Sequence, residues 1–308
     1  MGRLSGLIAA PFTALHPDGR LNLDMVDVQA EALQRNGVRG VFICGTTGEG
    51  ISLTVSERMQ LAERWRAAAP PGMTVIVHVG HTSLEEAKRL AAHAAEVGLP
   101  AISAMWPSPF KPRTQTGLVD MCAAVAAAAP GASFYYYHIP RLSGLDFSMA
   151  DFLRAARERI PNFAGLKFTH DDLMDYGRAL DVAAGELDVL YGCDEMLLSA
   201  LALGAVGAVG STYNFAAPVY HRIINAFKAG DLATAREEQV KVQHWVAVME
   251  KYGGLPAGKA VMRMIGIDCG PPRLPLRPLN AEEYAALRRE LERLGFFESI
   301  RGNSRDST

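Results

Sequence analysis

The sequence predicts an α/β fold, a (β/α)8 TIM barrel with additional C-terminal helices. Short apolar or β-branched runs bounded by glycine and proline alternate with helical patterns rich in alanine, leucine, glutamate and arginine. Strands separated by helices lie parallel in one sheet, because a crossover helix returns the chain to the same edge. The expected strands are Leu7–Thr13, Val38–Gly45, Thr74–Gly80, Ala101–Trp106, Ser133–Ile139, Phe163–Thr169, Val189–Gly192 and Ala205–Ser211.

A doubly wound open sheet is the alternative architecture, but the Gly-x-Gly-x-x-Gly motif of dinucleotide-binding sheets does not follow the first run. One barrel holds about 250 residues, so a chain of 308 residues leaves room for an appendage. We expect the barrel at 1–218, helices packed on it at 219–300 and a polar tail at 301–308. The appendage contains helical patterns near 219–229 and 231–252, a proline-rich segment at 270–278 and a final helix that ends near 297.

The overall composition is that of a globular protein with a large core. Apolar residues make up 49% and charged residues 21% of the chain, and the formal net charge is −2. Lysine and arginine are spread along the chain, which argues against a nucleic-acid or anionic-membrane partner and favours a small-molecule substrate. Residues 196–220 carry no charge, but Gly204, Gly207 and Gly210 interrupt them, so we expect no membrane span.

The cysteines favour a reducing compartment, and we therefore expect a cytoplasmic protein. They lie far apart in the chain and form no Cys-x-x-Cys pair, which argues against both a zinc knuckle and a disulfide framework. They are Cys44, Cys122, Cys193 and Cys269.

Barrel enzymes carry their reactive groups at the carboxyl ends of the strands, and one expected strand contains a lysine. Alternation in 163–169 places Lys167 and Thr169 on the inner face, with Leu166 and Phe168 toward the helices. Burial removes the hydration of an ammonium group and lowers its pKa, which produces the free amine that a nucleophile needs. The strand fits a structural lysine paired with an inward carboxylate equally well.

A second expected strand, Ser133–Ile139, places Tyr135 and Tyr137 on one face, with Tyr137 nearer the end of the strand. A phenol beside a Schiff base can transfer the proton that carbon–carbon cleavage requires. A tyrosine stripe taken alone is more often core packing.

Two loops after strands carry polar groups. Gly45–Gly50 combines glycines with Thr46 and Thr47, so backbone amides and hydroxyls can hold a carboxylate there. Asp194 and Glu195 follow the seventh run. Two roles fit them there: binding of sugar hydroxyls, or capping of the helix that follows.

Two polar pairs favour structural roles. Thr54 and Glu57 have the spacing of a capping box. His78 and His81 lie three residues apart, but His81 leads directly into a helix start, which favours a structural or capping role over a metal site.

Taken together, these motifs resemble the N-acetylneuraminate lyase branch of the dihydrodipicolinate synthase superfamily, from the first strand into the C-terminal helices. Gly45–Glu49 is similar to the pyruvate-carboxylate loop, Tyr137–Pro140 to the catalytic tyrosine motif and Gly165–Lys167 to the Schiff-base strand. Gly192–Glu195 and Gly210–Asn214 are more specific to the lyases.

The resemblance implies a class I aldolase that cleaves N-acetylneuraminate to pyruvate and N-acetylmannosamine as a homotetramer, with no metal and no diffusible cofactor. It implies Lys167 as the imine nucleophile, Tyr137 as the proton-transfer group at the C4 hydroxyl, and Thr46 and Thr47 as the carboxylate site. The residues that it implies along the polyol are Thr169, Gly192, Asp194, Glu195 and Ser211.

Other pyruvate-dependent aldolases remain as alternatives, namely a 4-hydroxy-tetrahydrodipicolinate synthase or a 2-keto-3-deoxy sugar-acid aldolase, as does a non-catalytic binding barrel. Such synthases usually carry an arginine two residues after the proline of the tyrosine motif, where this chain has Leu142. Arg141 would point away if the strand continued through it. Relatives often supply a tyrosine to a neighbouring subunit from the segment equivalent to Trp106–Pro112, which here contains none.

Overall fold

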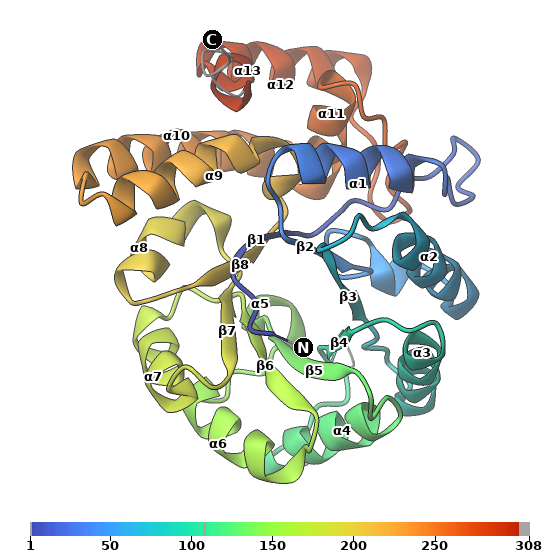
Figure 1. Ribbon diagram of the computed structural model, residues 1–308. Helices are drawn as coiled ribbons and strands as arrows, with labels where there is room; N and C mark the ends of the chain where they lie inside the picture. The colour runs from blue at the N-terminus through green and yellow to red at the C-terminus, as the bar shows by residue number, and fades with distance from the viewer. Residues whose placement is uncertain (1, 107–108, 302–308) are drawn as a thin grey trace.

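The computed structural model describes residues 2–106 and 109–301, and its parallel strands close into one barrel in chain order (Figure 1). Strand β8 pairs with β1 as well as with β7, which completes the ring. The predicted barrel is therefore confirmed. The strands are β1 Gly6–Ala9, β2 Gly40–Ile43, β3 Thr74–His78, β4 Ala101–Ala104, β5 Ser133–His138, β6 Phe163–Phe168, β7 Asp188–Tyr191 and β8 Gly207–Gly210.

All eight strands end earlier than the sequence pattern predicted, because the chain leaves the regular ladder before the polar residues at the rim. Single hydrogen bonds still hold some of these rim residues against the barrel. Thr169 N donates to His138 O at 2.8 Å, and Gly192 N donates to Phe168 O at 2.7 Å. Residues just beyond the strands therefore have a fixed place at the carboxyl end of the barrel.

Helices surround the barrel, and several begin at a capping side chain. The predicted capping box is present: Glu57 N donates to Thr54 Oγ1 at 3.2 Å, and Thr54 N donates to Glu57 Oε2 at 2.8 Å. The helices up to the last strand are α1 Met25–Arg35, the 3-10 turn η1 Gly50–Ser52, α2 Val55–Ala68, α3 Leu84–Glu96, α4 Gln115–Ala127, α5 Pro140–Ser143, α6 Met149–Arg159, α7 Leu173–Ala183, the 3-10 turn η2 Asp194–Met196 and α8 Leu197–Ala202.

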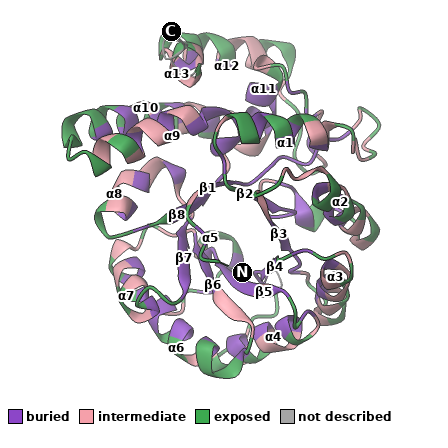
Figure 2. Ribbon diagram, viewed as in Figure 1, coloured by how far each residue is buried: buried purple, intermediate pink, exposed green. Residues whose placement is uncertain are grey.

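Strand alternation divides the buried side chains into two clusters. The outer cluster lies between strands and helices and includes Leu166 and Phe168, as predicted. The smaller cluster fills the barrel interior and includes Ile8, Phe42 and Leu190. In Figure 2 the strands are almost entirely buried, while the helices expose their outer faces. Tyr135 and Tyr137 of β5 belong to the inner cluster.

The C-terminal helices pack above one side of the barrel, where α9 and α10 lie side by side (Figure 1). Trp245 and Phe296 join them to the last helices by an edge contact with ring centroids 5.1 Å apart. The first two helical patterns expected there correspond to α9 and α10, whereas the single final helix expected to end near 297 is divided into α12 and α13, and α11 was not anticipated. These helices are α9 Tyr213–Lys228, α10 Leu232–Lys251, α11 Leu255–Met264, α12 Ala281–Arg293 and α13 Phe296–Ile300.

The division of the chain at residue 218 stays a prediction, since α9 runs across that position. Of the expected tail, residues 302–308 lie outside the described residues. The uncharged stretch 196–220 is divided among η2, α8, β8 and α9. Within the described part of the chain, no helix has both the length and the apolar character needed to cross a bilayer.

Candidate active site

Lys167 lies in the barrel interior, with its side chain directed as strand alternation predicted. The residue is 5% exposed. Its Nζ lies 4.2 Å from the ring centroid of Tyr137 and 4.5 Å from that of Phe42, so the amine packs against two aromatic rings. Of the two buried lysines in the described residues, Lys259 has a carboxylate partner and Lys167 has none within ion-pair distance. This environment favours a nucleophile over a structural ion pair.

Tyr137 packs beside Lys167. Its ring makes edge contacts with Phe42 and with His78, at centroid separations of 5.4 Å and 6.0 Å. Its hydroxyl lies 3.4 Å from Thr46 Oγ1, at the mouth of the loop that follows β2. The phenol therefore lies between the amine of Lys167 and this loop, where it can exchange a proton with a molecule bound to both.

The loop after β2 presents unused donors. Among the described residues, the backbone N–H groups of Thr46 and Thr47 donate to no backbone carbonyl. Thr47 is half-buried, whereas Thr46 is exposed. The loop is held from below by Thr13, whose hydroxyl donates to Gly48 O at 2.6 Å. Free amides next to threonine hydroxyls are suited to a carboxylate.

A buried ion pair supports this loop from the C-terminal helices, and sequence reasoning missed it. Glu49 closes the loop in a left-handed conformation, with φ of 54°. Its carboxylate lies 2.7 Å from Lys259 Nζ on α11, and each side chain is 2% exposed. Arg273 N donates to the other carboxylate oxygen at 2.7 Å. The only sequence signal was a lysine flanked by apolar and small residues, Leu255–Gly258 before it and Ala260–Met262 after it.

Asp194 follows β7 and is buried. Thr212 donates to Asp194 Oδ2 from its backbone N at 2.7 Å and from its hydroxyl at 2.6 Å. Burial raises the pKa of Asp194, while the bonds from Thr212 and the charge of Lys167 oppose the rise. Burial, and next Asp194, raise the pKa of Glu195. Asp194 thus interacts electrostatically with both Lys167 and Glu195, and Thr212 was not predicted.

Two glycines allow close packing on this side of the rim. A Cβ on Gly192 would lie 2.0 Å from Thr169 Oγ1, and one on Gly210 would lie 1.9 Å from Asp194 Oδ1. The Thr169 hydroxyl is buried and has no hydrogen-bond partner among the described residues. Ser211 follows β8 and is half-buried. An unsatisfied hydroxyl beside carboxylates is suited to a ligand with several hydroxyl groups.

Comparison with known proteins agrees with this geometry. The profile of the dihydrodipicolinate synthetase family matches residues 3–294. The chain belongs to this family. It is 46% identical over 297 residues to the N-acetylneuraminate lyase of Xenopus tropicalis, covering 95% of this chain and 97% of that protein. The human N-acetylneuraminate lyase is 40% identical, with 96% and 93% covered.

Solved structures of the family give the same result. Proteus mirabilis N-acetylneuraminate lyase superposes with a TM-score of 0.93 at 43% identity, covering 96% of this chain and 100% of that chain. A DHDPS structure from Cyanidioschyzon merolae superposes with a TM-score of 0.87 at 27% identity, covering 95% and 98%. The family resemblance drawn from the sequence motifs is therefore confirmed, and the chain lies in the lyase branch.

His78 and His81 have different structural partners. His78 Nε2 accepts from Met105 N at 3.1 Å, and burial lowers the pKa of His78 well below its usual value. His81 Nδ1 accepts from Ser83 N at 3.0 Å at the start of α3. The described residues bring no further metal-ligand set to this pair.

The segment after Tyr137 departs from the sequence expectation. Arg141 and Leu142 lie in the short helix α5 rather than on a continued strand, because Ser143 N and Gly144 N donate back to Ile139 and Pro140 carbonyls. The strand does not continue through Arg141, so the alternation argument does not apply to this residue. Both residues are exposed. The positive charge of Arg141 acts to lower the pKa of Glu195.

Two of the residues in the segment Trp106–Pro112 lie outside the described part of the chain. Trp106 itself is buried, and Phe110 is exposed.

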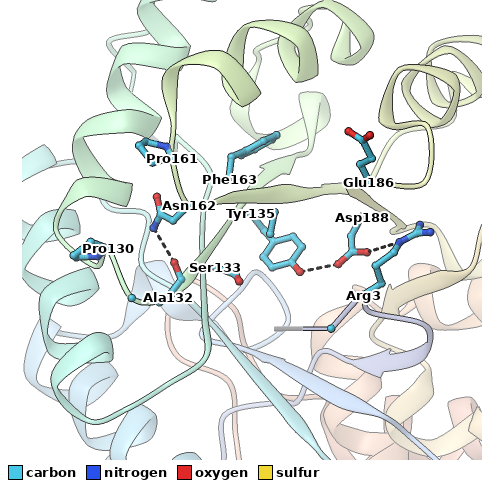
Figure 3. A pocket seen from close by; sticks show the side chains of 13 residues that line it. Arg3, Pro130, Ala132, Ser133, Tyr135, Pro161, Asn162, Phe163, Glu186 and Asp188 are labelled. Carbon is cyan, nitrogen blue, oxygen red and sulfur yellow. Dashed lines mark hydrogen bonds and ion pairs between the residues drawn. The ribbon is translucent and has the colours of Figure 1, made fainter.

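A cavity of about 320 Å³ opens at the amino end of the barrel, opposite the rim that carries Lys167. Tyr135 donates to Asp188 Oδ2 there at 2.8 Å, and Arg3 Nε lies 3.5 Å from Asp188 Oδ1 (Figure 3). Tyr135 thus points into the barrel, as predicted, but its hydroxyl serves this lower end. Polar groups at the amino end of such barrels serve stability rather than chemistry.

Proposed function

We propose that this chain is a class I aldolase that cleaves N-acetylneuraminate to pyruvate and N-acetylmannosamine. One observation carries the proposal: a buried lysine without a carboxylate partner lies against a tyrosine inside the barrel of a chain whose relatives are named N-acetylneuraminate lyases. We further propose a cytoplasmic homotetramer, in keeping with the resemblance and the cysteine pattern.

In the proposed reaction, the Lys167 amine adds to the C2 ketone of the open-chain sugar acid and water leaves, which forms an iminium ion. Tyr137 accepts the proton of the C4 hydroxyl as the C3–C4 bond breaks. The bonding electrons move into the iminium to give an enamine, and N-acetylmannosamine departs as the aldehyde. Protonation of the enamine carbon and hydrolysis then release pyruvate and restore the amine.

The remaining residues orient the substrate in this proposal. Free amides and hydroxyls of Thr46 and Thr47 would hold the carboxylate next to C2. The polyol would extend toward the ends of β6, β7 and β8. Its expected contacts are Thr169, Gly192, Asp194, Glu195 and Ser211.

The direct test is incubation of the full chain with N-acetylneuraminate and detection of pyruvate with a coupled dehydrogenase. Pyruvate release together with N-acetylmannosamine supports the proposal. Pyruvate release only from a 2-keto-3-deoxy sugar acid, or condensation of pyruvate only with aspartate semialdehyde, would reassign the substrate within the family. No turnover of any of these, with no imine formed from pyruvate, would support a binding barrel.

A further inference from the structure

Three potential metal ligands from separate segments meet on the outer side of β5 and β6. His138 ends β5, His170 lies two residues beyond β6, and Asp146 lies between α5 and α6. One ligand atom from each lies within 4.8 Å of the others. His138 follows Tyr137 directly and therefore points to the opposite face of the strand, away from the barrel interior. This cluster is thus separate from the proposed catalytic residues.

Neither ring nitrogen of His138 makes a hydrogen bond in the described structure. His138 is 1% exposed, and both Nδ1 and Nε2 are buried without a hydrogen-bond partner among the described residues. Its neighbours are largely aromatic rings, with Phe168 at 5.0 Å and His170 at 5.6 Å between centroids. A buried imidazole normally satisfies at least one nitrogen, because leaving polar atoms unpaired is costly. A bound cation would satisfy one directly.

The donor set has a defined chemical preference. Two imidazoles and one carboxylate suit Zn²⁺ and similar divalent transition ions, with water in the fourth position. Bonds of about 2.1 Å in a tetrahedron require ligand atoms about 3.4 Å apart, so the cluster must contract. The two outer ligands can supply that movement, because Asp146 is exposed and the His170 side chain is 26% exposed. His138 would remain fixed in the core.

We propose that His138, Asp146 and His170 form a binding site for a divalent transition metal ion of the Zn²⁺ type. The ion would join the end of β5, the loop before α6 and the end of β6. Those two strands carry Tyr137 and Lys167 on their inner face, so the bound ion would tie together the outer side of the same two strands. The inference concerns binding and stability and does not depend on the proposed reaction.

Co²⁺ is a direct probe, since its visible absorption bands report coordination by protein ligands. The untagged full chain is titrated with Co²⁺, and Zn²⁺ is then added in competition. We expect one equivalent to bind, intense absorption typical of four or five ligands, and displacement by Zn²⁺. Zn²⁺ should also raise the midpoint of thermal unfolding.

Variants of the two outer ligands test the assignment without disturbing the core. His170→Asn and Asp146→Asn should each weaken Co²⁺ binding at least tenfold and abolish the Zn²⁺-dependent rise in the midpoint. Asp171→Asn is the matched control, because its carboxylate lies 3.3 Å from His170 Nε2 and is the rival ligand. His81→Gln controls for histidine content, and both control variants should bind as the parent chain does.

Three results would overturn the proposal. The parent chain shows no cobalt absorption, the His170 variant binds as tightly as the parent, or Asp171→Asn abolishes binding while Asp146→Asn does not. His138→Asn completes the set: if it unfolds as the parent does without metal but no longer responds to Zn²⁺, the buried ligand is established. A retained response would exclude His138.

Discussion

Tyr137 and Lys167 are direct partners in the parallel ladder of β5 and β6. Neighbouring residues in such a ladder point to the same face, so both side chains enter the barrel at the same level. The Thr46 hydroxyl, 3.4 Å from the phenol, extends this row to the loop after β2. Strand register and the loop after β2 therefore determine the relative positions of the Lys167 amine, the Tyr137 phenol and the expected carboxylate site.

We predict that borohydride added with pyruvate will attach a stable adduct to Lys167, because reduction traps the imine. Peptide mapping by mass spectrometry locates the adduct. Lys167→Arg should abolish trapping and turnover, since a guanidinium stays protonated at working pH. An adduct on Lys259 or Lys111, or no adduct at all, would show that the assigned nucleophile is wrong.

Tyr137→Phe should lower kcat about a hundredfold or more, as expected for the loss of a positioned acid–base group, while imine trapping partly survives. Tyr135→Phe is the matched control from the same strand face. It removes the bond to Asp188 and should lower the free energy of unfolding by about 1–3 kcal/mol, with kcat little changed. Equal kcat for the Tyr137 variant and the parent would remove Tyr137 from the mechanism.

Strand positions of the site could be predicted from the sequence, because alternation within a strand is a local property. Lys167, Tyr137 and the outward Phe168 all follow from it. The support of the site could not be predicted in this way. Glu49 and Lys259 are far apart in the chain, and only the packing of α11 against the loop brings them together. Alternation does not apply at Arg141, where helical hydrogen bonds replace the strand.

The Glu49–Lys259 pair yields a stability prediction. Lys259→Met should lower the free energy of unfolding by about 3–5 kcal/mol, because it leaves the buried Glu49 carboxylate uncompensated. The KM for pyruvate in the condensation direction should also rise, since Glu49 closes the carboxylate loop. Chemical denaturation and steady-state kinetics measure the two effects.

Two further variants distinguish the destabilising effect of the uncompensated buried charge from the effect of losing a lysine side chain. Adding Glu49→Gln to Lys259→Met should recover part of the stability. Lys88→Met removes an exposed pair, with Lys88 Nζ 3.0 Å from Glu85, and should cost no more than about 1 kcal/mol. Similar losses in Lys88→Met and Lys259→Met would contradict the argument.

Acid stability should depend on Glu57. The guanidinium of Arg273 and the bonds from Thr54 lower the pKa of Glu57 to about 2, below its usual value near 4.5, despite the opposing effect of burial. A lowered folded-state pKa contributes stability that is present above the unfolded pKa and is lost as pH falls through the folded pKa.

Glu57→Gln should therefore be less stable than the parent at pH 7, and the difference should shrink between about pH 4.5 and pH 2. Urea unfolding measured across this range tests the prediction. Glu237→Gln, at an exposed position on α10, is the control and should follow the parent curve at every pH. A difference that stays constant down to pH 2 would show that the Arg273 contact does not stabilise the ionised carboxylate.

The last prediction concerns the aldehyde accepted in the condensation direction. Aspartate semialdehyde carries a carboxylate that needs a cationic partner when it leaves water, whereas N-acetylmannosamine is neutral. Leu142 offers no donor at the position where synthases usually carry arginine. Arg141 is charged, but it interacts electrostatically with Glu195, so the charge of Arg141 is already partly balanced.

We therefore expect kcat/KM for N-acetylmannosamine to exceed that for aspartate semialdehyde by at least about a hundredfold. Leu142→Arg should narrow the ratio by improving use of the semialdehyde, because a guanidinium can pair with its carboxylate. Leu232→Arg adds the same charge at a residue 51% exposed on α10, compared with 52% for Leu142, and should leave the ratio unchanged. If the parent chain prefers the semialdehyde, the lyase assignment fails, yet the Schiff-base mechanism on Lys167 would stand, since both condensations begin from the same pyruvate enamine.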